Sequence, residues 1–240
     1  MTTTPPRPSS ARSRSLLVAE TFISFQGEGP STGQPAAFIR LSRCNLTCRF
    51  CDTPYTWDWS QFRPDTEAER RTTDELADWA LTQRADLIVI TGGEPLIQQA
   101  ALVPLATRLA GSGRRVEIET NGTIPPSAEL TGAATRFNVS PKLSGSGVPD
   151  DRRLVPAALA AFAATGKAIF KFVICHQREL DEVAALEAAH GLSPVWVMPE
   201  GVSEHTVLEG MRAVAREALA RGWCLSGRLH VLLWGDARGC

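Results

Sequence analysis

Several features that would place this chain of 240 residues in a special class are missing. No apolar run approaches the roughly 18 residues that a membrane-spanning helix needs. No basic excess marks a nucleic-acid-binding surface, because 25 Lys+Arg stand against 26 Asp+Glu, for a net charge of −1. Lysine is scarce as well, with only Lys142, Lys167 and Lys171. These absences leave an ordinary globular protein, and its 43% hydrophobic residues are enough for a sizeable core.

The cysteines point away from a disulfide framework, which suits small secreted domains that lack a core. The chain opens with no secretory leader that has an apolar centre, so we expect a cytoplasmic location in a reducing compartment. Three of the six cysteines lie within eight residues, as Cys44, Cys48 and Cys51. That clustering predicts a metal or cluster site. The other three are expected to be a core thiol, a strand thiol and an exposed chain end, namely Cys175, Cys224 and Cys240.

The order of apolar and helical segments predicts one α/β domain over residues 16–240, preceded by a disordered tail over residues 1–15. Strands are expected at 17–25, 37–41, 87–91, 116–120, 137–139, 168–174, 195–198 and near 229–233. Helices are expected at 74–84, 98–111, 152–164, 178–190 and 204–221. Thr72 and Glu75 offer a capping box ahead of the first of these helices. Such alternation predicts a mostly parallel sheet with crossover helices, open or closed into part of a barrel.

The strongest motif is Cys44-Asn-Leu-Thr-Cys48-Arg-Phe-Cys51, which follows a predicted strand with the spacing C-x3-C-x2-C. Thiolates suit zinc or iron–sulfur clusters. A structural zinc ion or an electron-carrying cluster takes four ligands, but the next candidates, Cys175 and His176, are far away in the sequence. Three cysteines on a four-iron cluster would leave one iron open to a small molecule. A zinc loop completed by a distant residue is the alternative.

Two further motifs end predicted strands. In Thr91-Gly92-Gly93-Glu94-Pro95, the two glycines would let a ligand approach the backbone closely. Glu119-Thr120-Asn121-Gly122 is either a polar ligand contact or a turn with an exposed glutamate. Each motif alone is also compatible with an ordinary turn.

The cysteine motif, with Phe50 before its last cysteine, resembles the cluster motif of the radical S-adenosylmethionine superfamily. The Gly92-Gly93-Glu94-Pro95 turn resembles the GGEP motif of the same superfamily. The resemblance implies that Cys44, Cys48 and Cys51 bind a 4Fe-4S cluster whose open iron is chelated by S-adenosylmethionine. It also implies an incomplete TIM-like β/α barrel with the site at the C-terminal ends of its strands.

Other motifs narrow the resemblance to the 7-carboxy-7-deazaguanine synthase family. They are F-Q-G-E-G at 25–29, F-I-R-L at 38–41, C-D-T at 51–53 with Trp57, S-P-K at 140–142 and L-L-W-G at 232–235. The resemblance covers most of the chain from about Glu20 onward. It implies a radical lyase that converts 6-carboxy-5,6,7,8-tetrahydropterin into 7-carboxy-7-deazaguanine with loss of ammonia, in queuosine or other 7-deazapurine biosynthesis.

The same resemblance implies roles for particular residues. The S-adenosylmethionine site would comprise Phe50, Cys51, Asp52, Gly93, Ser140, Pro141 and Lys142, with the turn at 198–201 as a weaker candidate. The pterin site would comprise Phe25, Gln26, Gly27, Arg40 and Thr91. Thr53 would be a ligand to Mg2+. The roles of His230, Trp234 and the Cys240 terminus stay open, but we expect the removal of residues 236–240 to impair turnover.

The resemblance further implies a homodimer and an external electron donor, a flavodoxin or a ferredoxin, with no nucleic-acid or membrane partner. Two other classes remain open from the residues. Another small radical enzyme, such as a glycyl-radical activase, would act on a protein and has no use for Q-G-E-G, C-D-T or S-P-K. A non-enzymatic zinc-binding module would hold one zinc ion per chain, with no iron or sulfide after reconstitution.

Overall fold

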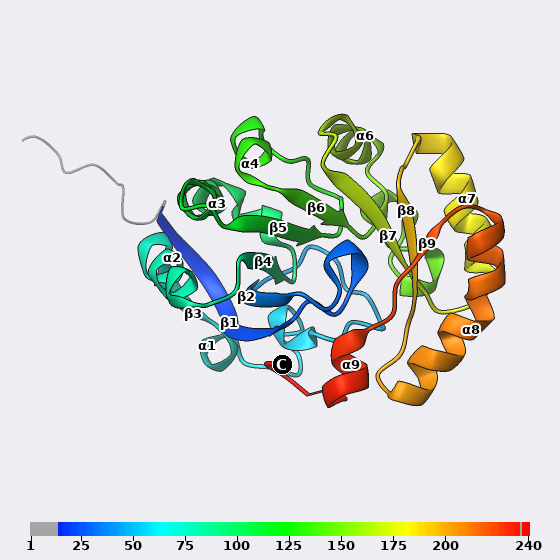
Figure 1. Cartoon of the computed structure of the whole chain (residues 1–240), viewed down its shortest axis with the longest axis horizontal. Coiled ribbons are helices and arrows are strands. Elements are labelled where there is room, and N and C mark those ends of the chain that lie inside the picture. Colours follow the sequence, from blue (N-terminus) through cyan, green and yellow to red (C-terminus); the bar gives the residue numbers. More distant parts are fainter. Residues whose placement is uncertain (1–13, 236) are drawn as a thin grey trace, which may run out of the picture.

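A curled, mostly parallel sheet organises the molecule (Figure 1). The computed structural model describes residues 14–235 and 237–240. Over these residues the sheet has nine strands in the order β3-β1-β2-β4-β5-β6-β7-β8-β9. Their bounds are β1 Ser15–Phe25, β2 Pro35–Leu41, β3 Glu69–Thr72, β4 Leu87–Gly92, β5 Arg115–Thr120, β6 Arg136–Val139, β7 Ala168–Ile174, β8 Val195–Pro199 and β9 Cys224–Leu225.

The direction of the strands changes at one side of the sheet. From β2 through β9 all neighbouring strands are parallel, whereas β1 pairs antiparallel with β2, and β3 pairs antiparallel with β1. Within the described residues, β3 and β9 are the two edges and do not pair with each other. The predicted incomplete barrel is therefore confirmed.

Six helices pack on the outer face of the sheet (Figure 1), namely α2 Thr73–Thr82, α3 Gln99–Gly111, α4 Ala128–Ala133, α6 Pro156–Ala164, α7 Glu179–His190 and α8 Glu204–Ala220. The other helices of the described residues are α1 Pro64–Glu67, α5 Asp150–Arg153 and α9 Leu229–Trp234, and they add no residue to the core on that face. The main core lies between helices and sheet, where outward strand residues such as Ile90 and Ile118 meet helix residues such as Leu105 and Phe162. This burial of apolar surface is the main stabilising term of the fold. In the part of the chain that the structure describes, no helix is long and apolar enough to cross a membrane.

The inner face of the sheet changes character along the strands. At the N-terminal ends of β2 and β4 it carries a small apolar cluster of Ala36, Phe38, Leu87 and Val89. Because side chains alternate between the two faces of a strand, the next inward positions on these strands are Arg40 and Thr91. The inner face thus becomes polar toward the C-terminal ends of the strands, and this is where the candidate site lies.

The first seven predicted strands and four of the five predicted helices are present within a few residues of the expected bounds. The capping box is also confirmed, since Thr72 and Glu75 exchange side-chain to backbone hydrogen bonds at the start of α2. Residues 1–13 of the predicted tail lie outside the described residues, and β1 begins at Ser15.

Two predictions are wrong. The segment near 229–233 is the helix α9, because a short apolar run fits a helix as well as a strand. The helix expected at 152–164 is divided into α5 and α6. Pro156 stands in the first turn of α6, where its missing N–H costs nothing, and so it starts a new helix.

Candidate active site

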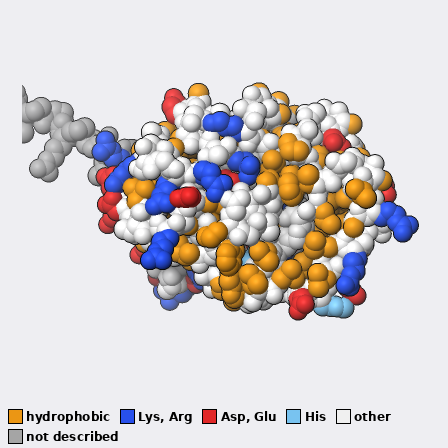
Figure 2. Space-filling model, in the orientation of Figure 1, with side chains coloured by type: hydrophobic (Ala, Val, Ile, Leu, Met, Phe, Trp, Pro, Cys, Tyr) orange, Lys and Arg blue, Asp and Glu red, His pale blue; other side chains and the backbone are white. Residues whose placement is uncertain are grey.

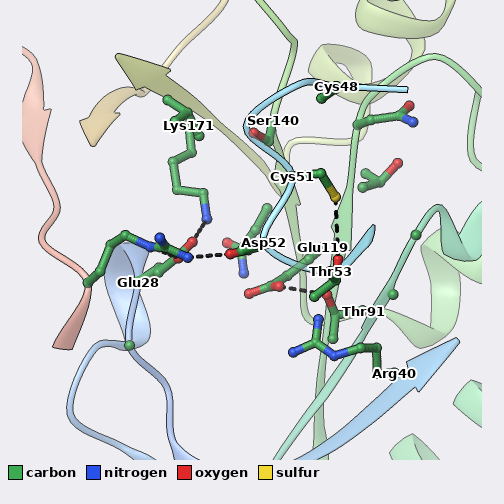
Figure 3. Close-up of a pocket in the computed structure, with 18 of the residues that line it drawn as sticks. Glu28, Arg40, Cys48, Cys51, Asp52, Thr53, Thr91, Glu119, Ser140 and Lys171 are labelled. Carbon is green, nitrogen blue, oxygen red and sulfur yellow. Dashed lines mark hydrogen bonds and ion pairs between the residues drawn. The ribbon is translucent and has the colours of Figure 1, made fainter. Parts of the chain in front are cut away.

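One large cavity opens at the C-terminal ends of the strands, and nearly all of the predicted site residues line it. The three clustered cysteines, Thr53, and the predicted cofactor and pterin residues all contribute, with the exception of Pro141, which is buried beside it. Side chains that are more than 80 residues apart in the sequence, such as Thr53 and Ser140, come together here (Figure 3). The motifs identified in the sequence therefore surround the same cavity.

The cysteine loop follows β2 and carries its thiols on the wall of the cavity. The Sγ atom of Cys44 accepts a hydrogen bond from the backbone N of Leu46 at 3.4 Å, and the Sγ atom of Cys51 accepts one from Trp57 Nε1 at 3.3 Å. Burial raises the pKa of Cys44 to about 12 and also raises the pKa of Cys48. These two thiols, Cys44 and Cys48, are therefore protonated without a metal, and binding of a cluster must release their protons.

This loop fits a cluster with three protein ligands. All three thiols face one cavity, and N–H donors to sulfur are the kind of outer contact that stabilises a ligating thiolate. Over the described residues, no three His, Cys, Asp or Glu side chains are gathered around a point that would hold a single metal ion.

Gly92 ends β4 and Gly93 follows it, and both lie close to the backbone of the cysteine loop. A Cβ on Gly93 would lie 2.2 Å from the carbonyl oxygen of Arg43 and 2.9 Å from Cys44 Cβ, and a Cβ on Gly92 would lie 2.2 Å from the oxygen of Leu41. These positions must be small because the end of β4 packs against the start of the cysteine loop. Both glycines also line the cavity, so the close approach of a ligand that the sequence suggests stays a prediction.

Glu94 of the same turn is fully buried and receives three hydrogen bonds. Its carboxyl group accepts from Thr120 Oγ1 at 2.8 Å, from Asn121 N at 2.7 Å and from Leu96 N at 2.9 Å. Burial raises the pKa of Glu94, although these bonds act in the opposite direction. The GGEP turn thus holds the Glu119–Gly122 turn in place.

Glu119 is half-buried and lines the cavity, so it is not the exposed turn residue that the sequence also allowed, and its contact with a ligand stays a prediction. Its oxygens accept hydrogen bonds from Thr91 Oγ1 at 2.8 Å and from Gln26 Nε2 at 3.0 Å (Figure 3). Arg40 lies on β2, the neighbour of β4, and pairs through its Nε with Glu20 Oε1 at 2.7 Å. The guanidinium group of Arg40 and the carboxylate of Glu119 therefore both line the cavity, with Thr91 of β4 on the strand between them.

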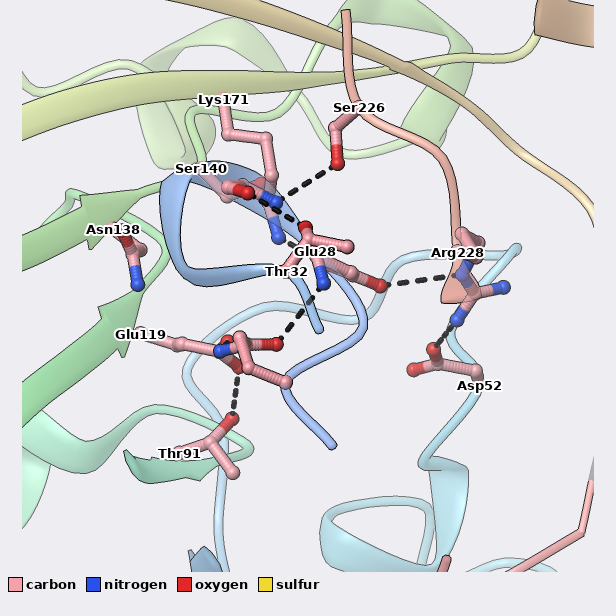
Figure 4. A network of polar contacts seen from close by, with 12 residues as sticks. Glu28, Thr32, Asp52, Thr91, Glu119, Asn138, Ser140, Lys171, Ser226 and Arg228 are labelled. Carbon is pink, nitrogen blue, oxygen red and sulfur yellow. Dashed lines mark hydrogen bonds and ion pairs between the residues drawn. The ribbon is translucent and has the colours of Figure 1, made fainter. Parts of the chain in front are cut away.

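A cluster of four charged residues closes the other side of the cavity (Figure 4). Glu28 forms an ion pair with Lys171 and a second with Arg228 Nε at 3.3 Å. Arg228 also pairs with Asp52 and donates from Nη1 to the carbonyl oxygen of Gly201 at 2.7 Å. Burial acts to raise the pKa of Glu28, but the positive charges of Lys171 and Arg228 outweigh it and hold that pKa well below its usual value.

Sequence reasoning did not assign Lys171 or Arg228 to the site. The scarcity of lysine was the only available signal for Lys171, which lies on the inner face of β7. Arg228 is one of 22 arginines, and nothing in its local sequence distinguishes it from a surface residue.

Comparison with known proteins identifies this arrangement. A 7-carboxy-7-deazaguanine synthase from Pyrobaculum aerophilum is 37% identical over 93% of this chain and 97% of its own length. One from Hyperthermus butylicus is 38% identical over 95% of this chain and 96% of its own length. The chain belongs to the 7-carboxy-7-deazaguanine synthase family.

Two further comparisons agree with this assignment. The sequence pattern of the radical SAM superfamily, where SAM is S-adenosylmethionine, matches residues 38–142. The crystal structure of QueE from Escherichia coli superposes with a TM-score of 0.68 at 27% identity, covering 88% of this chain and 93% of that one. The family is one of radical SAM lyases, so neither the activase nor the zinc-binding module is favoured.

The remaining predicted residues lie in or around the cavity of this family member. Lys142 Nζ donates to Ser140 Oγ at 2.9 Å, which joins the two ends of the S-P-K turn. His230 and Cys240 line the cavity, so the terminal cysteine is not simply an exposed end. Trp234 stacks on Phe25, with 6.1 Å between ring centroids.

Of the predictions for the two other cysteines, one is confirmed and one is wrong. Cys224 lies in β9, as predicted. Cys175 is half-buried just after β7 and lines a second pocket, so the prediction of a core thiol is wrong. It follows the last residue of the strand, where the chain leaves the core.

Proposed function

We propose that this chain is a radical SAM lyase that converts 6-carboxy-5,6,7,8-tetrahydropterin into 7-carboxy-7-deazaguanine with loss of ammonia. The observation that carries the proposal is the single cavity into which the cysteine loop, Arg40 and Glu119 all face, in a chain 37% identical to a named synthase over 93% of its length. Cys44, Cys48 and Cys51 would hold a 4Fe-4S cluster. When bound, the cluster and S-adenosylmethionine supply the radical that starts the reaction at the substrate.

The inner-face residues suit a pterin that carries a carboxylate. The planar guanidinium of Arg40 can hold both oxygens of that carboxylate. Glu119 accepts hydrogen bonds and would take N–H groups of the aminopyrimidinone ring, with Gln26 and Thr91 fixing its orientation. Phe25 and Gly27 complete this wall of the cavity. These contacts would fix the substrate and exclude water from it.

The cofactor side of the cavity would be formed by Phe50, Asp52, Gly93, Ser140 and Lys142, which all line it. Pro141 would act by holding the S-P-K turn, since it is buried rather than exposed to the cavity. Asp52 pairs with Arg228, which keeps its carboxylate directed across the cavity.

Thr53 is proposed as a ligand to Mg2+. Its hydroxyl is a hard oxygen donor on the cavity wall, 3.7 Å from Cys51 Sγ. A cation shared between Thr53 and the substrate carboxylate would orient the pterin. Omitting Mg2+ from an assay, with chelator present, is expected to lower turnover.

Partners and location are proposals that rest on the family. The chain would receive electrons from a flavodoxin or ferredoxin in the cytoplasm and would form a homodimer. Exposed apolar side chains gather on β1 and α9, as Figure 2 shows, and they support an interface there: Ile23, Phe25, Leu233 and Trp234. Sedimentation of the purified protein tests the dimer.

Product analysis tests the function directly. The protein is reconstituted anaerobically with iron and sulfide and supplied with S-adenosylmethionine, reductant, Mg2+ and the pterin. We expect 7-carboxy-7-deazaguanine by mass spectrometry, and we expect Cys48→Ala to abolish both product and cleavage of S-adenosylmethionine. Cleavage without that product would contradict the proposed substrate, and zinc without iron or sulfide would contradict the radical chemistry.

A further inference from the structure

Asn138 is a buried polar residue on the inner face of β6, and no role is predicted for it from the sequence. It is 3% exposed and lines the cavity. Its Nδ2 donates to Glu117 Oε2 at 3.0 Å, but its Oδ1 has no hydrogen-bond partner within the part of the chain that the structure describes. A buried carbonyl oxygen without a donor is costly, so a native structure that keeps one requires an explanation.

The strand register places Asn138 among the ligand-binding candidates. Arg40 pairs with Thr91 between β2 and β4, Thr91 bonds Glu119, and Glu119 pairs with Asn138 between β5 and β6. These four residues form one layer of inward-facing polar side chains across four neighbouring strands. Figure 4 shows Asn138 beside Glu119, with Thr91 on the other side of Glu119. Three of the four, Arg40, Thr91 and Glu119, are already proposed to bind the pterin.

Glu117 determines which end of the Asn138 amide is available. Its Oε1 accepts from Ser31 Oγ at 2.6 Å and from Arg136 Nη1 at 2.8 Å, so its carboxylate is held in one position. A carboxylate can only accept, and therefore the nitrogen of Asn138 must face it. The oxygen of Asn138 is then left as an acceptor in a fixed position, because the neighbouring carboxylate of Glu117 has no hydrogen to donate to it.

We infer that Asn138 is a specificity-determining residue whose Oδ1 accepts a hydrogen bond from an N–H group of the bound pterin. The inference rests on the proposed function, because the pterin ring is the nitrogen-rich ligand of that reaction. Glu117 is a positioning residue that acts through Asn138. A ligand without an N–H at this point would leave the oxygen unpaired, which is how a polar site rejects an analogue.

The test measures binding of 6-carboxy-5,6,7,8-tetrahydropterin to the reconstituted protein by anaerobic titration calorimetry. Asn138→Ala is expected to raise the dissociation constant about tenfold, the usual effect of one neutral hydrogen bond. Asn138→Leu, which is close in size to Asn, is expected to weaken binding to the same extent. It shows that the effect does not come from a cavity left by alanine. The electron paramagnetic resonance change that S-adenosylmethionine causes in the reduced cluster should stay as in the wild type.

Two further variants separate binding from packing. In Glu117→Gln the partner can donate or accept, so the Asn138 amide can turn over, and pterin binding is expected to weaken. The same change in the Asn138→Ala background should add nothing. Ser24→Ala is the matched control, because Ser24 Oγ is also buried without a partner among the described residues but does not line the cavity.

Each result has a definite meaning. Dissociation constants within twofold of the wild type for both Asn138 variants overturn the inference and leave the proposed function standing. Weaker S-adenosylmethionine binding with unchanged pterin binding also overturns it. If the wild type itself does not bind the pterin, the proposed function fails and this inference falls with it.

Discussion

At the scale of single residues, the charge balance of the cavity depends on Glu28. Lys171 and Arg228 are 7% exposed, and Glu28 is the acidic side chain that both of them contact. A buried charge is tolerated only when it is paired, so the carboxylate of Glu28 offsets the cost of burying two positive charges, those of Lys171 and Arg228. The four-residue cluster with Asp52 therefore stabilises the loop at 26–34 against the far side of the sheet.

Removing the Glu28 charge should destabilise the protein in a pH-dependent way. Glu28→Gln is expected to lower the free energy of unfolding by about 3 kcal/mol at pH 7, because it leaves Lys171 without a charged partner. The pKa of Glu28 is lowered in the folded state, so its contribution is complete above the unfolded pKa of about 4.3. It is lost as pH falls through the folded value. The difference from the wild type should thus be greatest near neutrality and narrow in acid.

Urea denaturation of the cluster-free chain at a series of pH values measures this difference. Glu69→Gln is a suitable control, because Glu69 is 73% exposed and its pair with Arg71 spans 3.8 Å. We expect that control to change stability by less than about 0.5 kcal/mol at every pH. A Glu28→Gln difference that is small at pH 7, or that grows in acid, would show that the cluster does not stabilise the fold in this way.

At the scale of elements, three turns at the ends of parallel strands are bound to one another. The cysteine loop meets the GGEP turn through Gly93 and meets the Glu119–Gly122 turn through Asn45. Asn45 Oδ1 accepts from Asn121 Nδ2 at 2.9 Å, and Asn45 Nδ2 donates to Thr123 Oγ1 at 2.8 Å. Its backbone oxygen accepts from Arg152 Nη2 at 2.8 Å. The loop is therefore held by its neighbours before any cluster is present.

Asn45→Ala should loosen the cysteine loop and reduce its capacity to hold a cluster. Loss of the two side-chain hydrogen bonds leaves Asn121 and Thr123 partly unpaired, at a cost of about 1–2 kcal/mol. We expect faster amide exchange over residues 44–51 and less iron per chain after reconstitution. Thr47→Ala is the control, because Thr47 is exposed in the same loop. Equal iron content and equal exchange in the two variants would argue against the role of Asn45.

The elements also show what the sequence could predict. Motifs that depend on local chemistry are the easiest to interpret: the Thr72–Glu75 capping box is confirmed, and the three spaced cysteines line one cavity. The helix α9 was missed because its apolar run packs against β1, which is distant in the sequence. Lys171, Arg228 and Asn138 were missed for a related reason. Their partners Glu28 and Glu117 lie 21 to 200 residues away, and only the strand order brings them together.

At the scale of the whole molecule, the end of the chain spans the open side of the incomplete barrel. After β9 at one edge, α9 returns to β1 near the other edge, and the backbone N of Leu229 donates to the oxygen of Gly27 at 2.9 Å (Figure 1). The last residues continue past Tyr55, and Cys240 reaches the cavity. The C-terminal segment thus closes a gap that the sheet leaves open.

Arg238 attaches this final segment to the barrel. Its Nη1 donates to Glu67 Oε2 at 2.7 Å, its Nε lies 3.3 Å from Glu20 Oε2, and its guanidinium lies 3.8 Å from the centre of the Tyr55 ring. Glu20 in turn accepts hydrogen bonds from Tyr55 and from Arg40, the proposed ligand of the substrate carboxylate. The position of the C-terminal segment is therefore linked to Arg40, which we propose as a substrate ligand.

Weakening this attachment should affect substrate binding more than folding. We expect Arg238→Ala to raise KM for the pterin about fivefold, since half-exposed ion pairs contribute about 1 kcal/mol or less. Removal of residues 236–240 should have a larger effect on both KM and kcat, because it also takes Cys240 from the cavity wall. Steady-state kinetics of the reconstituted enzyme measure both, with Arg63→Ala as a control whose ion pair is 77% and 66% exposed. Unchanged kinetics after the deletion would mean that the barrel binds its substrate without the C-terminal segment, and that the link from Arg238 through Glu20 to Arg40 has no part in turnover.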